Sequence, residues 1–160
     1  MKSLRLIAVL SVIFTSHAFS QQQPQLAVTD QELLKYATAI DSINEMSASV
    51  RLELADMVKS GTSKISTSRY NELSKIITDD VALQEAKATP EEIEFVKQVV
   101  ERKSQELDKI NSTYQTLAKD YVTPAVFNKV KKALVNDPIL KKRYDSLMIE
   151  LGKDDPAADQ

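Results

Sequence analysis

Acidic side chains are the most abundant reactive groups of this chain, and two neighbouring pairs of carboxylates precede or open predicted helices. Asp79 is followed by Asp80, and Glu91 by Glu92. Two carboxyl groups can share acid and base work, as in glycoside hydrolysis, or supply oxygen ligands to a metal ion. Negative side chains at a helix start are also stabilised by the helix dipole. We therefore interpret both pairs as helix N-terminal residues and predict no metal site and no cofactor.

Nucleophilic catalysis has few candidate groups in this sequence. The 160-residue chain has no cysteine, and its single histidine, His17, lies within the first twenty residues. A chain that loses these twenty residues as a signal peptide has neither histidine nor cysteine. It therefore cannot complete the usual pairs of nucleophile and base or the usual ligand sets of transition metals. We expect a protein without enzymatic activity, and a carboxylate-dependent hydrolase is the alternative that the 23 acidic residues leave open.

Two asparagines, Asn71 and Asn128, hold positions that helical periodicity does not explain. Asparagine inside a helix costs about 0.6 kcal/mol relative to alanine. We interpret each amide as bonded to backbone near the turn after a long helix, and the alternative is a paired polar ligand site. Each asparagine follows an aromatic residue and precedes an aspartate by nine residues, so that the candidate site positions are Tyr70, Asn71, Asp80, Phe127, Asn128 and Asp137.

The residues between these positions predict an all-α protein with two long helices of about 30 residues each. Thr29 and Thr89 each precede a glutamate by three residues, Glu32 or Glu92, which is the pattern of a capping box. Apolar residues then recur at steps of three, four or seven, which keeps them on one helical face. The first long helix is expected to end at Gly61, in the left-handed conformation that closes many helices.

Two short helices are predicted to follow each long helix. Ser66 and Thr123 are expected to cap the first short helix of each pair, and Asp80 and Asp137 to cap the second. The last helix is predicted over residues 138–151. Hydrophobic staples are expected where the residue before the cap packs on the residue one turn later, in the pairs Ile65 with Tyr70 and Val122 with Phe127.

This order of elements occurs twice, at an offset of 60 residues for the long helices and 57 for the short ones. The sequence therefore predicts a helical bundle from two repeated units, each one long amphipathic helix followed by two short helices. We assign residues 29–88 to unit 1 and residues 89–152 to unit 2, packed as one compact domain about a pseudo-twofold axis. Residues 21–28 are predicted to be a flexible leader, and residues 153–160 a disordered acidic tail.

The first twenty residues have the pattern of a secretory signal peptide, with two basic residues, an apolar run from 6 to 14, and small residues at the end. Cleavage is expected after Ser20 or after Ala18, and an uncleaved anchor is the remaining alternative. The apolar run is shorter than the roughly 20 residues that span a bilayer. Cleavage after Ser20 changes the formal net charge from −2 to −4, because two of the 21 basic residues and no acidic residue precede that point.

Two stretches carry a family resemblance: "VTDQELLKYATAI", which opens the first long helix, and "FNKVKKALVNDPIL" near the end. With the signal peptide, they resemble the bacterial domain-of-unknown-function 4168 family, in which a Ser or Thr cap is followed by Tyr-Asn and then Asp-Pro. Val81 replaces the proline in unit 1, and Phe127 replaces the tyrosine in unit 2. The resemblance covers residues 28–150 as two tandem copies. It implies an exported helical protein of the bacterial envelope, and it implies no known reaction or ligand.

Export, helical repetition and the lack of catalytic residues favour a non-enzymatic periplasmic binding or interaction module of the bacterial envelope, or alternatively a secreted one. The partner would be an unidentified protein or envelope component, and no oligomeric state is predicted. Scattered basic residues and a negative net charge argue against nucleic-acid binding. A third hypothesis is an envelope-surface-associated protein whose basic clusters at Lys129–Lys132 and Lys141–Arg143 contact anionic components.

Overall fold

The structure is a computed structural model that describes residues 27–154. Helical residues make up 85% of this part of the chain, which contains no strand, so the all-α prediction is confirmed. In chain order the elements are α1 (Asp30–Ser60), η1 (Gly61–Ser63), α2 (Thr67–Leu73), α3 (Asp80–Glu85), α4 (Pro90–Thr116), the π-helical η2 (Leu117–Tyr121), α5 (Pro124–Asn136), α6 (Pro138–Leu151) and η3 (Gly152–Asp154).

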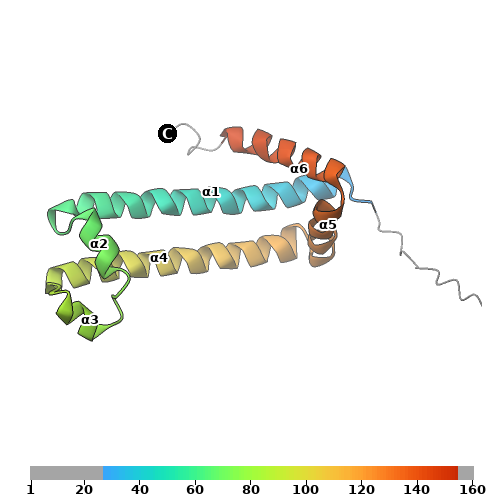
Figure 1. Cartoon of the computed structure of the whole chain (residues 1–160). Coiled ribbons are helices and arrows are strands. Elements are labelled where there is room, and N and C mark those ends of the chain that lie inside the picture. Colours follow the sequence, from blue (N-terminus) through green and yellow to red (C-terminus); the bar gives the residue numbers. More distant parts are fainter. Residues whose placement is uncertain (1–26, 155–160) are drawn as a thin grey trace, which may run out of the picture.

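The two long helices set the shape of the molecule. Helices α1 and α4 run side by side in opposite directions, and the 31 residues of α1 extend over about 46 Å (Figure 1). Helices α2 and α3 lie at one end of this pair, and α5 and α6 lie at the other end (Figure 1). Helix α6 turns back and follows the first part of α1.

Both predicted capping boxes are confirmed. The Thr29 hydroxyl accepts a hydrogen bond from the Glu32 backbone at 3.2 Å, and the Thr29 backbone donates to the Glu32 carboxylate at 2.8 Å. The same two bonds join Thr89 and Glu92, at 3.2 and 2.9 Å, and Pro90 takes the first helical position of α4. Each box satisfies backbone groups that a helix start would otherwise leave unpaired.

Buried apolar side chains form two separate clusters, one at each end of the long helix pair. The α5/α6 cluster joins the start of α1 to the last helices and contains Leu33, Tyr36, Ala39, Val122, Phe127, Val130, Ala133 and Leu140. The α2/α3 cluster joins the start of α4 to the helices between the long ones and contains Ile65, Leu73, Ile77, Leu83, Phe95, Val96 and Val99. Each long helix therefore begins against short helices from the other half of the chain.

The left-handed conformation predicted for Gly61 is wrong, because its φ is −78°, an ordinary value for any L-residue. The position still requires glycine, for a reason of packing. A Cβ on Gly61 would lie 2.5 Å from Cε2 and 3.0 Å from Cε1 of Phe95. The absence of a side chain lets the end of α1 pass over the Phe95 ring in the α2/α3 cluster.

The cap predicted at Asp80 is one residue out of register. Asp79 is the N-cap of α3, where its carboxylate accepts from the backbone amides of Val81 at 3.1 Å and Ala82 at 3.0 Å, while Asp80 is the first helical residue. Helix α2 ends at Leu73, and the turns that follow bring Asp79 rather than Asp80 into the extended conformation of a cap, with φ of −112°. Either of the two adjacent aspartates could serve as the N-cap of α3, and the position at which α2 ends selects Asp79.

The cap at Asp137 is confirmed, since its carboxylate accepts from Ile139 at 2.9 Å and Leu140 at 3.0 Å. Ser66 also caps α2 as predicted, accepting from the Arg69 amide at 3.2 Å. Thr123 differs: it holds the N-cap position of α5 but makes no side-chain cap bond. Thr123 comes directly after the π-helical turn η2 and Val122, and its φ is 76°, whereas the N-caps of the other α-helices have negative φ. In this conformation its hydroxyl is not directed at the first amides of α5.

The signal peptide, most of the leader and residues 155–160 of the predicted tail lie outside the described residues. Within the leader, Val28 packs against the α5/α6 cluster, and Lys153 and Asp154 at the tail's start belong to η3. In the described range, no helix combines the length and apolar character that crossing a bilayer requires.

Candidate binding groove

The predicted site residues fall at opposite ends of the molecule. Tyr70 and Asn71 lie in α2, whereas Phe127 and Asn128 lie in α5, so the two asparagines do not meet in one ligand site (Figure 1). Both asparagines are exposed. Among the residues that the structure describes, neither amide side chain makes a hydrogen bond, so the expected capture by backbone is not found there.

The aromatic members of the pattern pack differently from one another. Phe127 is buried, 9% exposed, with ring centroids 5.0 Å from Tyr36 and 5.7 Å from Tyr114. Tyr70 is half-buried and meets the edge of Phe95 at 6.4 Å. Burial raises the pKa of the Tyr70 phenol, so that it stays neutral and can donate a hydrogen bond.

Tyr70 and Asn71 line a groove between α1, α2 and α4 with a volume of about 490 Å³. Four other surface hollows, of 370 to 430 Å³, each include at least one carboxylate, whereas this groove includes none. Its remaining lining residues are Arg51, Leu54, Ala55, Val58, Lys59, Thr62, Thr67 and Lys103. In a chain of formal net charge −2, a groove that carries three basic side chains and no acid is a local inversion of charge.

The basic side chains of the groove are available to a ligand. Arg51, Lys59 and Lys103 are exposed, and none of them forms an ion pair with a residue of the described range. Leu54 and Val58 are half-buried and give the groove an apolar floor. The groove can therefore accept a group that carries negative charge beside an apolar part.

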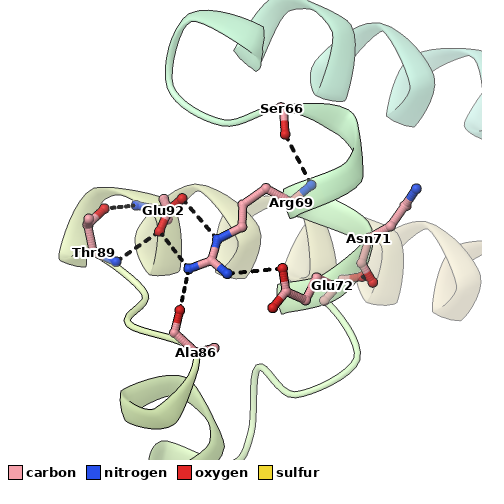
Figure 2. Close-up of polar contacts among 8 residues, drawn as sticks. Ser66, Arg69, Asn71, Glu72, Ala86, Thr89 and Glu92 are labelled. Atoms are coloured by element: carbon pink, nitrogen blue, oxygen red, sulfur yellow. Dashed lines mark hydrogen bonds and ion pairs between the residues drawn. The ribbon is translucent and has the colours of Figure 1, made fainter.

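Arg69 fixes α2, and with it Tyr70 and Asn71, against the start of α4. Its guanidinium donates to Glu92 at 3.2 Å, to Glu72 at 3.0 Å and to the backbone oxygen of Ala86 at 2.7 Å. Figure 2 shows these contacts and shows Asn71 projecting away from them. Since Glu92 also caps α4, one carboxylate holds two elements in place.

The hydrogen bonds from the Arg69 side chain and the Thr89 backbone hold the pKa of Glu92 below its ordinary value of 4.5. An equivalent arrangement occurs at the other end. Lys129 pairs with Glu32 at 2.7 Å and donates to the backbone oxygen of Ala27 at 3.3 Å. Neither cation was predicted from the sequence, although a capping-box glutamate has a second oxygen and a charge that favour a basic partner.

The middle of the helix pair is joined by polar contacts. Arg102 of α4 pairs with Glu53 of α1 at 2.7 Å and with the buried Glu106 at 2.9 Å. The hydrogen bond from Arg102 lowers the pKa of Glu53, the opposite of the raised pKa that a carboxyl general acid needs. Residues 27–154 contain no group of three or more potential ligands that could hold a metal ion. The ion pair between Arg102 and Glu53 thus serves to connect α1 to α4.

Comparison with known proteins does not identify a relative. No family model matches the chain, and neither a curated protein nor a solved structure was found to be similar to it. Membership of the domain-of-unknown-function 4168 family stays a prediction from the residues.

Proposed function

We propose that this chain is a non-enzymatic binding module of the bacterial envelope that holds an acidic, partly apolar segment of a partner protein in the groove between α1, α2 and α4. The observation that carries the proposal is the charge of that groove. Three unpaired cations surround an apolar floor, and the lining includes no carboxylate. Opposite charge across an interface favours encounter and selects the partner.

Two polar groups favour a peptide segment over a lipid chain. The exposed Asn71 amide has both a donor and an acceptor, which match the oxygen and N–H of a peptide group. The neutral Tyr70 phenol can donate beside it. A hydrocarbon chain would leave these groups without partners. A segment with one apolar residue between acidic ones would place its apolar side chain over Leu54 and Val58.

We also propose that the chain is exported to the periplasm, or secreted, after loss of residues 1–20. The support is the basic, apolar and small-residue order of that segment. N-terminal sequencing of the protein from a periplasmic extract should give a chain that starts at Gln21 or at Phe19. Full-length protein retained in the cytoplasm would contradict export.

The proposal includes two copies of one helical unit, at residues 29–88 and 89–152, that pack about a pseudo-twofold axis. The ion pairs support it, because Arg69 of the first unit holds Glu92 of the second, and Lys129 of the second holds Glu32 of the first. The two capping boxes lie 60 residues apart, which is the offset of the two long helices. The repeat is tested by superposing α1 and α2 on α4 and α5 in an experimental structure. If the backbones of the two helix pairs do not superpose, the repeat is refuted.

Site-specific photo-crosslinking in living cells tests the groove. A photoreactive phenylalanine analogue at Asn71 should capture a partner, and the same analogue at Asn128 is the matched control, because Asn128 is equally exposed but lies at the opposite end. Charge reversal by Arg51→Glu and Lys103→Glu should remove the adduct at position 71. Identical adducts at both positions, or an adduct that survives charge reversal, would refute the groove as the binding site.

A further inference from the structure

The junction of α5 and α6 exposes two large aliphatic side chains. Val135 is 83% exposed and Ile139 is 76% exposed, and they flank Asp137, the cap between the two helices. Both values exceed those of the other exposed large apolar residues of the described chain. Neither side chain contributes to the adjacent buried cluster. Together the two side chains expose apolar surface to solvent at the junction of α5 and α6.

Unpaired lysines lie about one helical turn from these aliphatic residues, because Lys131 and Lys132 precede Val135 by four and three residues in α5 and Lys142 follows Ile139 by three in α6. Lys131, Lys132 and Lys142 are exposed and form no ion pair within residues 27–154. The neighbouring carboxylates are engaged elsewhere, since Asp137 accepts backbone amides and Asp145 pairs with Lys141. We call Lys131, Lys132, Val135, Ile139 and Lys142 the α5–α6 corner.

The corner lies where the chain enters the described structure. Ala27 and Val28 line the same surface hollow as Ile139, and the Ala27 backbone oxygen accepts a hydrogen bond from Lys129.

From these observations we infer that the α5–α6 corner docks on the surface of an anionic lipid bilayer. Valine and isoleucine enter the boundary between headgroups and acyl chains, and the lysine side chains extend to lipid phosphates. Each lysine near such a surface strengthens binding about fivefold, so three lysines together contribute roughly a hundredfold. An acidic protein would satisfy the lysines but would leave two protruding aliphatic side chains without a pocket, which favours lipid.

The test is co-sedimentation of the exported chain, from Gln21 onward, with vesicles of phosphatidylglycerol and phosphatidylethanolamine at low salt. We expect binding that weakens in high salt and is much weaker to neutral phosphatidylcholine. Removing charge by Lys131→Gln, Lys132→Gln and Lys142→Gln together should weaken binding at least tenfold, and Val135→Ser with Ile139→Ser should also weaken it. All variants begin at Gln21 and lack the apolar run of residues 6–14, so a difference between them reports the corner.

The control variants are Val81→Ser and Lys64→Gln, which alter exposed residues at the α2/α3 end. They should bind like the unchanged protein. Equal binding by the corner variants, equal loss in the controls, or equal binding to neutral vesicles would overturn the inference. If the corner variants lose affinity for polyglutamate but not for vesicles, the corner is a protein-docking surface and the lipid assignment falls. The inference does not depend on the groove, whose crosslink at position 71 these variants should leave unchanged.

Discussion

Replacing Gly61 by alanine sets two physical effects against each other. The backbone at Gly61, with φ of −78°, suits alanine, and such a substitution by itself stabilises a protein by about 0.4 to 1 kcal/mol through the unfolded state. The added methyl group, however, would lie 2.5 Å from one carbon of the Phe95 ring. Overpacking of a core costs about 1 to 3 kcal/mol.

We expect the steric effect to dominate, because the Phe95 ring cannot move freely. Its side chain is 8% exposed within the α2/α3 cluster, and its ring meets Tyr70 of α2. Gly61→Ala should therefore lower the free energy of unfolding by about 1 to 2 kcal/mol. Urea unfolding followed by far-ultraviolet circular dichroism measures this change, and an unaltered m-value would show that the transition remains comparable.

A double variant separates this clash from other causes. Phe95→Leu removes the ring carbons that the new methyl group meets, so Gly61→Ala should cost less in the Phe95→Leu background than in the unchanged protein. The coupling between the two sites should be about 1 kcal/mol. Additive effects, or a Gly61→Ala variant that is more stable than the unchanged protein, would refute the packing argument.

Three further substitutions test the local structure. Because the pKa of Glu92 is lowered in the folded protein, its ionised form contributes its full stabilisation above about pH 4.5, and this stabilisation is lost as the pH falls through the lower folded pKa. Glu92→Gln should therefore lose less stability than the unchanged protein over that acid range. Identical acid profiles of the two proteins in urea unfolding would contradict this. Lys87 has a φ of 52°, so Lys87→Gly should raise the free energy of unfolding by about 0.5 to 1 kcal/mol, and a decrease would show that its side chain stabilises the turn. Thr123→Gly, at φ of 76° with no cap bond to lose, should raise it by about 1 kcal/mol in the same assay, and no gain would argue against strain at this position.

The features that the sequence predicts correctly depend on residues close together along the chain. A capping box needs only Thr29 and Glu32, or Thr89 and Glu92, and four residues of sequence contain all of its information. The correct ends of α1 and α6 likewise follow from local periodicity and caps. Asp79 shows the limit, because choosing between it and Asp80 requires knowing where the preceding helix ends.

Features that depend on distant contacts were not predictable from one sequence. Gly61 is required by Phe95, which lies 34 residues later, and Arg69 is held by Glu92, 23 residues later. The groove draws its basic residues from α1 and α4, and its asparagine from α2. A pattern along the chain contains no signal for such a site, because charge becomes concentrated there only when three helices pack.

Under the proposed two-unit repeat, the two ends of the molecule use corresponding residues in different ways, and this difference favours the α2 end for polar recognition. The residue 60 positions after Arg51 is Asn111, and the residue 60 positions before Lys103 is Ile43, so these two groove cations have no basic counterpart, whereas Lys59 corresponds to Lys119. Asn71 lines the groove, whereas Asn128 lines none of the five hollows described above. If the aromatic and asparagine pair served folding alone, both copies should be used alike. Instead Phe127 is buried without a polar group, while its counterpart in α2 keeps a hydroxyl at the groove.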